Sequence, residues 1–145
     1  MPLFNLGQGS FVPEASTVTF DSFELGTENP AFTFENVPDV GTVEVSFATN
    51  FQGQTSSLLL REGVFTLSDS NPDGPLTLDL DAAPVFTAND GIAETNPVLS
   101  GTPTFNGPIS VLFSQPVAAV GLTGGFFDAV ESTSIEAFDV NGNSL

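Results

Sequence analysis

VEVSFA, at residues 43–48, decides the fold class of this chain, because large apolar residues at positions 43, 45 and 47 alternate with small or acidic ones. Successive side chains of an extended chain point to opposite faces, so this period of two predicts a strand that buries one face. The same alternation recurs at Leu76–Leu80 and at Ile109–Phe113. The sequence therefore predicts three half-buried strands spread along the chain.

Turn-forming residues separate further short stretches that are also candidate strands. Asn71-Pro-Asp-Gly-Pro75 and Asn106-Gly-Pro108 are two of these turn signals. Residues 1–15 and Asn89–Asn106 show no alternation and are expected to be connections. The further strands are expected at Thr17–Phe23, Ala31–Glu35, Ser57–Leu67, Val85–Ala88, Val117–Leu122 and Thr133–Val140.

The composition also argues for strands, since 14 Gly and 11 Pro leave few uninterrupted windows of helical length. Short strands joined by Gly, Pro and Asn turns are typical of an antiparallel sandwich or jelly roll. A chain of 145 residues has the size of one domain. We therefore expect an all-β fold, an antiparallel β-sandwich or jelly roll, that forms a single domain over residues 1–145.

The charge balance is extreme, with 18 Asp and Glu against one basic residue, Arg61, and a formal net charge of −17. Such a chain repels phosphate backbones and anionic lipid, so nucleic acid and membrane surfaces are poor partners. No apolar run approaches the roughly 18 residues of a membrane span, so no membrane insertion is expected. Cations, and calcium above all, would relieve the repulsion between the carboxylates.

Most catalytic chemistry is excluded by residue types that the chain lacks. There is no His, Cys, Tyr or Lys, hence no histidine base, thiol nucleophile or Schiff-base lysine. A glycosidase built on two carboxylates such as Asp128 and Glu131 is the enzyme class that survives. Acidic residues are so abundant that most are more simply solvated surface, and we expect no enzyme activity.

Two acidic stretches are candidate calcium sites, since calcium prefers carboxylate, amide and backbone oxygens. Asp139, Asn141 and Asn143 place oxygen side chains at every second residue around a glycine, as at the start of a calcium loop. The alternative is a plain hairpin turn at Asn141-Gly142. Asp128 and Glu131 form the second candidate, with an exposed acidic loop as its alternative.

A carbohydrate or another surface polymer is the expected ligand class, because sandwich modules commonly bind sugars through aromatic faces. Trp and Tyr are absent, so a sugar would have to stack on phenylalanine. Phe126 and Phe127, which follow Gly124-Gly125, are the candidate ligand-binding pair. The alternative is that both belong to the core.

The C-terminus raises a separate possibility. Asn141-Gly142 is a strong hairpin signal, yet only three residues follow it to make a second strand. Either further C-terminal strands lie beyond Leu145, or the open edge pairs with a strand of another copy of the chain. The second reading predicts a self-associating structural domain and a homo-oligomer joined through edge strands.

The last quarter of the chain, GPISVLFSQPVAAVGLTGGFFDAVESTSIEAFDVNGNSL from Gly107 onward, resembles a β-sandwich domain of exported bacterial proteins. Such domains often carry PEP-CTERM sorting tails or are related to type I secreted proteins. The similarity rests on PVAAVGL, on the Gly-Gly-Phe-Phe-Asp segment and on SIEAFDVNGNSL, with TFDSFELGTENPAF as weaker support. It implies a non-catalytic module that is secreted or on the cell surface, with no catalytic residues to carry over. In such sequences a further strand and a sorting tail follow the turn.

Overall fold

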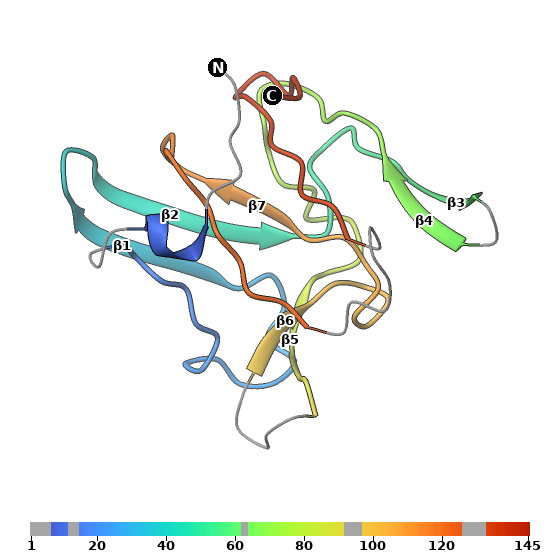
Figure 1. Ribbon diagram of the computed structural model, residues 1–145, viewed down its shortest axis with the longest axis horizontal. Helices are drawn as coiled ribbons and strands as arrows, with labels where there is room; N and C mark the ends of the chain where they lie inside the picture. The colour runs from blue at the N-terminus through green and yellow to red at the C-terminus, as the bar shows by residue number, and fades with distance from the viewer. Residues whose placement is uncertain (1–6, 12–14, 62–63, 92–96, 126–132) are drawn as a thin grey trace.

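The computed structural model describes residues 7–11, 15–61, 64–91, 97–125 and 133–145, and for most of β3 and β4 it describes the backbone alone. Within these ranges every regular element longer than one turn is a β-strand, and all strand pairs are antiparallel (Figure 1). The all-β prediction is therefore confirmed at this level. The elements are η1 (Gln8–Ser10), β1 (Ala31–Val37), β2 (Gly41–Ala48), β3 (Ser56–Arg61), β4 (Val64–Asp69), β5 (Phe86–Asn89), β6 (Pro97–Ser100) and β7 (Ser110–Phe113).

The central element is a three-stranded sheet in the order β1-β2-β7, with β2 in the middle. Its register places Val45 opposite both Phe32 and Phe113, so a row of large apolar residues crosses the sheet. The alternation in residues 43–48 appears as buried Val43, Val45 and Phe47 on one face of β2. The prediction made from this stretch is confirmed.

The core lies on that face of the sheet. Phe20 and Phe47 meet edge to face with ring centroids 5.6 Å apart, and Phe20 meets Phe32 in the same way. Such T-shaped contacts place the positive edge of one ring on the negative face of the other. The cluster consists of Val43, Val45, Phe47 and Val85, with Val18, Phe20, Phe32, Phe34, Val37, Leu99, Val111 and Phe113 packed against it.

The stretch Thr17–Phe23 supplies core residues without being a strand, contrary to the prediction. Val18 and Phe20 alternate in sequence and pack onto the core, but the backbone pairs with no strand in the described ranges. It ends instead in a turn in which the Phe23 amide donates to the Phe20 carbonyl. Alternation in the sequence indicates which side chains are buried. A β-strand also needs a neighbouring strand whose backbone pairs with it.

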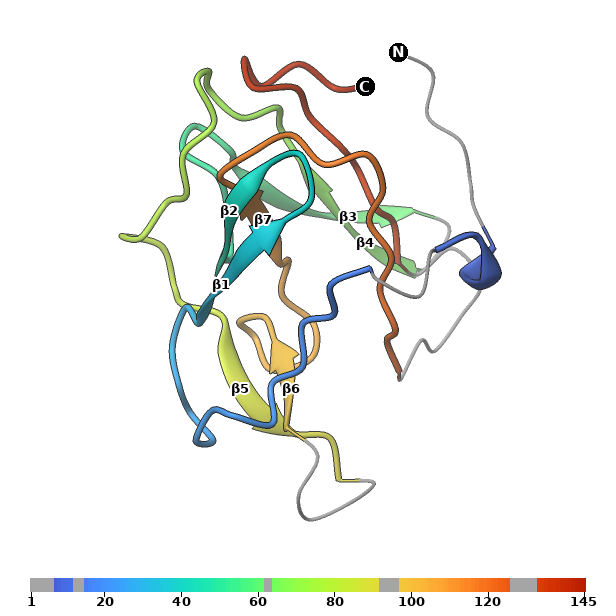
Figure 2. The same ribbon diagram turned by 90° about the vertical axis from the view of Figure 1, so that its left-hand side faces the viewer.

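A second sheet pairs β5 with β6 and is extended by a loop of the N-terminal region. The Gly26 amide donates to the Thr87 carbonyl at 2.7 Å, and the Asn29 amide donates to the Val85 carbonyl at 2.9 Å. Figures 1 and 2 show β5 and β6 below the three-stranded sheet. β6 lies inside Asn89–Asn106, which the sequence predicts to be a connection, so that part of the prediction is wrong.

The hairpin of β3 and β4 replaces the single strand expected over Ser57–Leu67. Six residue pairs form its ladder, from Ser56 opposite Asp69 to Arg61 opposite Val64. The chain therefore reverses inside a stretch that periodicity alone predicts to be continuous. Figure 1 shows this hairpin projecting from the rest of the molecule.

Three other predicted strands are not strands. Leu76–Leu80 runs beside residues 50–52 through a single bridge, Phe51 to Leu78, and a few backbone hydrogen bonds. Residues 117–122 are exposed and pair with no described strand. Thr133–Val140 makes only the bridge from Phe138 to Ser144. Each stretch has strand-like composition but lacks a continuous neighbouring edge.

Candidate functional site

The C-terminal turn brings together three of the predicted calcium ligands. One carboxylate oxygen of Asp139, Oδ1, accepts hydrogen bonds from the backbone amides of Asn141 at 2.8 Å and Asn143 at 3.0 Å. The Asn143 side-chain amide donates to both carboxylate oxygens, at 3.2 Å to Oδ1 and 3.0 Å to Oδ2. Asp139 thus closes its own loop, as aspartate often does in turns.

Close backbone packing holds this turn against the loop around residues 72–74. Gly142 has φ of +80°, and a β-carbon at this position would lie 2.6 Å from the Pro72 carbonyl oxygen. A β-carbon on Gly74 would overlap the backbone of Asn141. The Leu76 amide donates to the Val140 carbonyl at 2.9 Å, which ties the two loops together. Only glycine fits at these two contacts.

The last residues form the second arm of the hairpin. Phe138 and Ser144 make an antiparallel bridge, and the Leu145 amide donates to the Ala137 carbonyl at 3.0 Å. The Ser144 hydroxyl also donates to a carboxylate oxygen of Glu136 at 2.8 Å. The hairpin signal at Asn141-Gly142 therefore corresponds to a real turn, and Ser144 and Leu145 pair with the segment before it.

The hydrogen-bond donors around Asp139 change the pKa of its carboxyl group. Hydrogen bonds from the Asn143 side chain, then from the Asn143 and Asn141 backbone amides, lower the pKa of this carboxyl below its ordinary value of 3.8. The carboxylate form is the one that calcium needs, but its oxygens here accept from N–H groups. Binding calcium at this turn would require the Asn143 side chain to turn its oxygen toward the ion.

The structure does not describe the residues of the remaining site predictions. Asp128, Glu131, Phe126 and Phe127 lie outside the described residues. Within the described ranges no cluster of three or more acidic side chains is placed to hold a metal ion. A calcium site at Asp139, Asn141 and Asn143, or at Asp128 and Glu131, thus stays a prediction.

Replacing Asp139 with asparagine is expected to destabilise the protein at neutral pH, because the uncharged amide is a weaker acceptor for the turn's donors. The folded pKa lies below 3.8, so this contribution is present above that pH and is lost as the pH falls through the folded pKa. The difference in unfolding free energy between wild type and Asp139→Asn should therefore shrink below about pH 4. Urea unfolding at a series of pH values measures it, and a difference independent of pH contradicts the role of the charge.

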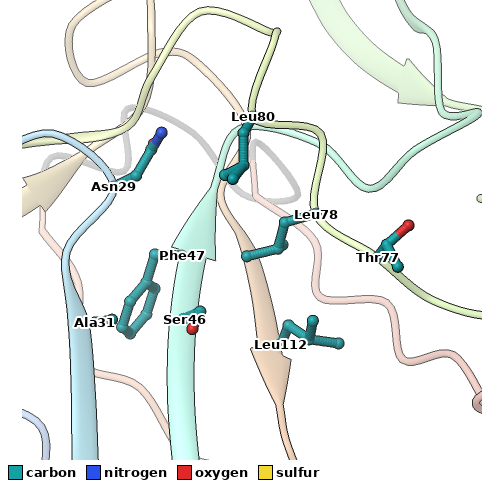
Figure 3. Close-up of a pocket in the computed structure, with 8 residues that line it drawn as sticks. All are labelled: Asn29, Ala31, Ser46, Phe47, Thr77, Leu78, Leu80 and Leu112. Carbon is teal, nitrogen blue, oxygen red and sulfur yellow. The ribbon is translucent and has the colours of Figure 1, made fainter.

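A groove lies on the other face of the central sheet near the end of β2, where the core residue Phe47 also lines it (Figure 3). Ala31, Ser46 and Leu112 line its floor from β1, β2 and β7, and Leu78 and Leu80 approach from the segment that crosses this face. Figure 3 shows these two leucines extending toward the end of β2. The groove has a volume of about 320 Å³, near the lower end of the range for small-molecule sites.

Polar side chains stand around the apolar part of the groove. Asn29, Ser46 and Thr77 line it together with the leucines. Asn29 is held in place because its side-chain oxygen accepts a hydrogen bond from the Val85 amide at 3.1 Å. Leu80 is 66% exposed, so the groove presents a large apolar side chain to solvent. The arrangement suits a ligand that has both an apolar face and hydroxyl groups.

No pattern in the sequence indicates this groove. The alternation in Leu76–Leu80 does place Leu78 and Leu80 on one side of their segment, but it assigns that side to a core. The floor residues are register partners of one another, Ala31 with Ser46 and Ser46 with Leu112, and they alternate with the core positions along their strands. Their proximity depends on strand pairing over more than 60 residues, which periodicity does not encode.

Comparison of the chain with protein-family models, with curated proteins and with solved structures gives no match. Among the described residues, no helix is long and apolar enough to cross a membrane.

Proposed function

We propose that this chain is a non-catalytic, acidic β-sandwich module of a secreted or cell-surface bacterial protein, and that it binds a carbohydrate or a similar surface component. The small antiparallel sheets and the phenylalanine-rich core support the sandwich architecture. The net charge of −17 favours surroundings rich in salt or divalent cations, as outside the cell.

The groove on the outer sheet face carries the ligand part of the proposal. A sugar ring has an apolar face of C–H groups and a rim of hydroxyls. The leucines at positions 78, 80 and 112 offer apolar contact, and Asn29, Ser46 and Thr77 offer hydrogen-bonding groups beside them. One or two sugar units match a groove of about 320 Å³.

Truncating Leu80 to alanine is expected to weaken sugar binding about three- to tenfold, because it removes apolar contact worth roughly 1 kcal/mol. The side chain is 66% exposed, so the fold should be unaffected. Binding is measured by NMR chemical-shift titration with a panel of neutral oligosaccharides. Leu122→Ala is the matched control, since Leu122 is 61% exposed and does not line the groove.

Two outcomes of this titration contradict the proposed ligand site. One is the absence of shifts at groove residues with every sugar of the panel. The other is equal weakening by Leu80→Ala and Leu122→Ala, which would place binding elsewhere. A polysaccharide that is cleaved during the titration would contradict the non-catalytic part of the proposal.

Calcium binding is the second element of the proposal. An ion that binds only the folded state stabilises it by about 2.7 kcal/mol at a concentration of roughly 100 times Kd. For a chain of this size we expect calcium to raise Tm by about 5 to 10 °C relative to EDTA. Differential scanning calorimetry measures the shift, and an unchanged Tm contradicts calcium binding.

Single substitutions can show which of the two predicted sites binds the calcium ion. Asp139→Asn should reduce the calcium-dependent rise in Tm if the ion binds at the C-terminal turn, and Asp128→Asn should reduce it if the ion binds at the second predicted site. Asp21→Asn, which removes an exposed acidic side chain of the N-terminal region, is the control for loss of charge alone. An equal effect of all three substitutions would indicate diffuse screening without a defined site.

A further inference from the structure

The sheet face that carries the groove continues beyond the groove along β2. Ala31, Ser46 and Leu112 lie side by side in the register of the sheet and line the groove. Two positions away along β1 and β2, Thr33 and Glu44 are paired in the same way. Alternate residues of a strand share a face and are roughly 7 Å apart, so Thr33 and Glu44 lie on this face next to the groove.

Ser114 extends this second row on the β7 side. Its backbone amide donates to the Glu44 carbonyl at 2.9 Å, and its hydroxyl accepts from the Glu44 amide at 2.8 Å. We call Thr33, Glu44 and Ser114 the polar row. All three residues are exposed. The polar row therefore presents one carboxylate between two hydroxyl-bearing residues to solvent.

The neighbours of Glu44 in the sheet supply no positive charge. Thr33 and Ser114, which lie beside it on the adjacent chain segments, are both uncharged. Arg61 is the single basic residue of the chain, and it lies in β3, which pairs with β4 and not with the central sheet. A positively charged ligand group would complement this carboxylate, and the net charge of −17 would favour its approach.

We propose that the groove and the polar row together bind an amino sugar within an oligosaccharide. One ring lies against the leucines of the groove, and the next ring places its protonated amine beside the carboxylate of Glu44. This proposal rests on the proposed sugar binding and specifies the charge of the sugar. Uronic acid or sulfated sugars would bring a negative charge to Glu44, so the same arrangement selects against them.

NMR titration with two matched disaccharides tests the proposal. One is the glucosamine disaccharide, kept below the pKa of its amino groups, and the other is its N-acetylated form, which has no charge. At low ionic strength we expect the amine form to bind about two- to fivefold more tightly, as is typical of one exposed ion pair. Its shifts should include the amides of the polar row. Added salt should reduce the difference, because it screens exposed charges.

Glu44→Gln removes the charge and keeps the size of the side chain. This variant should bind the amine form only as tightly as the N-acetylated form, and its affinity for the N-acetylated form should be unchanged. Glu24→Gln is the matched control, because it is the same substitution at an exposed residue that does not line the groove. It should leave the preference for the amine form intact.

The possible outcomes separate this proposal from the proposed function. If the N-acetylated form binds in the groove and the amine form binds no more tightly, the amino-sugar proposal is wrong and sugar binding stands. If neither disaccharide binds, and no neutral sugar does, both are wrong. Equal loss of preference in Glu44→Gln and Glu24→Gln would show diffuse attraction to the acidic chain and would also overturn the proposal. Equal weakening of both disaccharides by Glu44→Gln would overturn it too, since Glu44 would then bind hydroxyl groups.

Discussion

Replacing Phe47 with alanine is expected to lower the free energy of unfolding by about 3 to 5 kcal/mol. Phe47 is 7% exposed, lies on the central strand β2 and contacts the rings of Phe20 and Phe32 edge to face. Alanine would remove apolar contact with both rings and leave a cavity between the sheet and the N-terminal segment. Since domains of this size are stable by only about 5 to 15 kcal/mol, the loss is a large fraction of the total.

Urea unfolding followed by circular dichroism measures this effect. Leu122→Ala is the control, because it removes a large apolar side chain that is 61% exposed and should change stability by less than about 0.5 kcal/mol. A loss below roughly 1 kcal/mol for Phe47→Ala would mean that Phe47 does not pack in the core as described.

Replacing Gly142 with alanine should destabilise the protein by about 2 to 4 kcal/mol, for two reasons that add. Its φ of +80° is strained for any residue with a β-carbon, and that carbon would lie 2.6 Å from the Pro72 carbonyl oxygen. Either the C-terminal turn must move away from the loop at residues 72–74, or that loop must shift. Both changes would disturb the hydrogen bond from the Leu76 amide to Val140.

Gly26 offers a matched control for the backbone part of this effect. Its φ is +84°, but a β-carbon there would have no heavy atom within 4 Å. Gly26→Ala should therefore report only the strain of the left-handed conformation, about 1 kcal/mol. Thermal unfolding of the two variants separates the terms, and equal losses would show that the turn does not pack against Pro72 as tightly as described.

The fold class was predictable from the sequence because strand periodicity is a local property. The alternation in β2, and in residues 109–113 around β7, reports directly which face of each strand is buried. β6 was missed because PVLS has four residues and no alternation, and it becomes a strand only by pairing with β5. Residues 117–122 are the converse case. Their composition predicts a strand, but no strand among the described residues pairs with them.

The site was predictable only in part. Asn141-Gly142 correctly indicated a tight turn, and Asp139, Asn141 and Asn143 do gather there, because all of these interactions lie within five residues. The sequence could not show that Asn143 donates to Asp139, since an amide side chain can present either its oxygen or its nitrogen. The sequence also could not show the groove, because its lining residues come from segments that are far apart in the sequence and lie together only after folding.

The pairing of β2 with β7 has a consequence for how the chain acquires its structure. β1 and β2 are consecutive and can form a hairpin early, whereas Ala48 finds its partner Ser110 only after most of the chain has been made. Closing so long a loop is entropically unfavourable before the contacts form, and non-local pairing of this kind is associated with slow folding. A nascent chain that has not yet reached Ser110 cannot complete the central sheet. Until β7 is made, one edge of β2 lacks the strand that pairs with it in the folded protein.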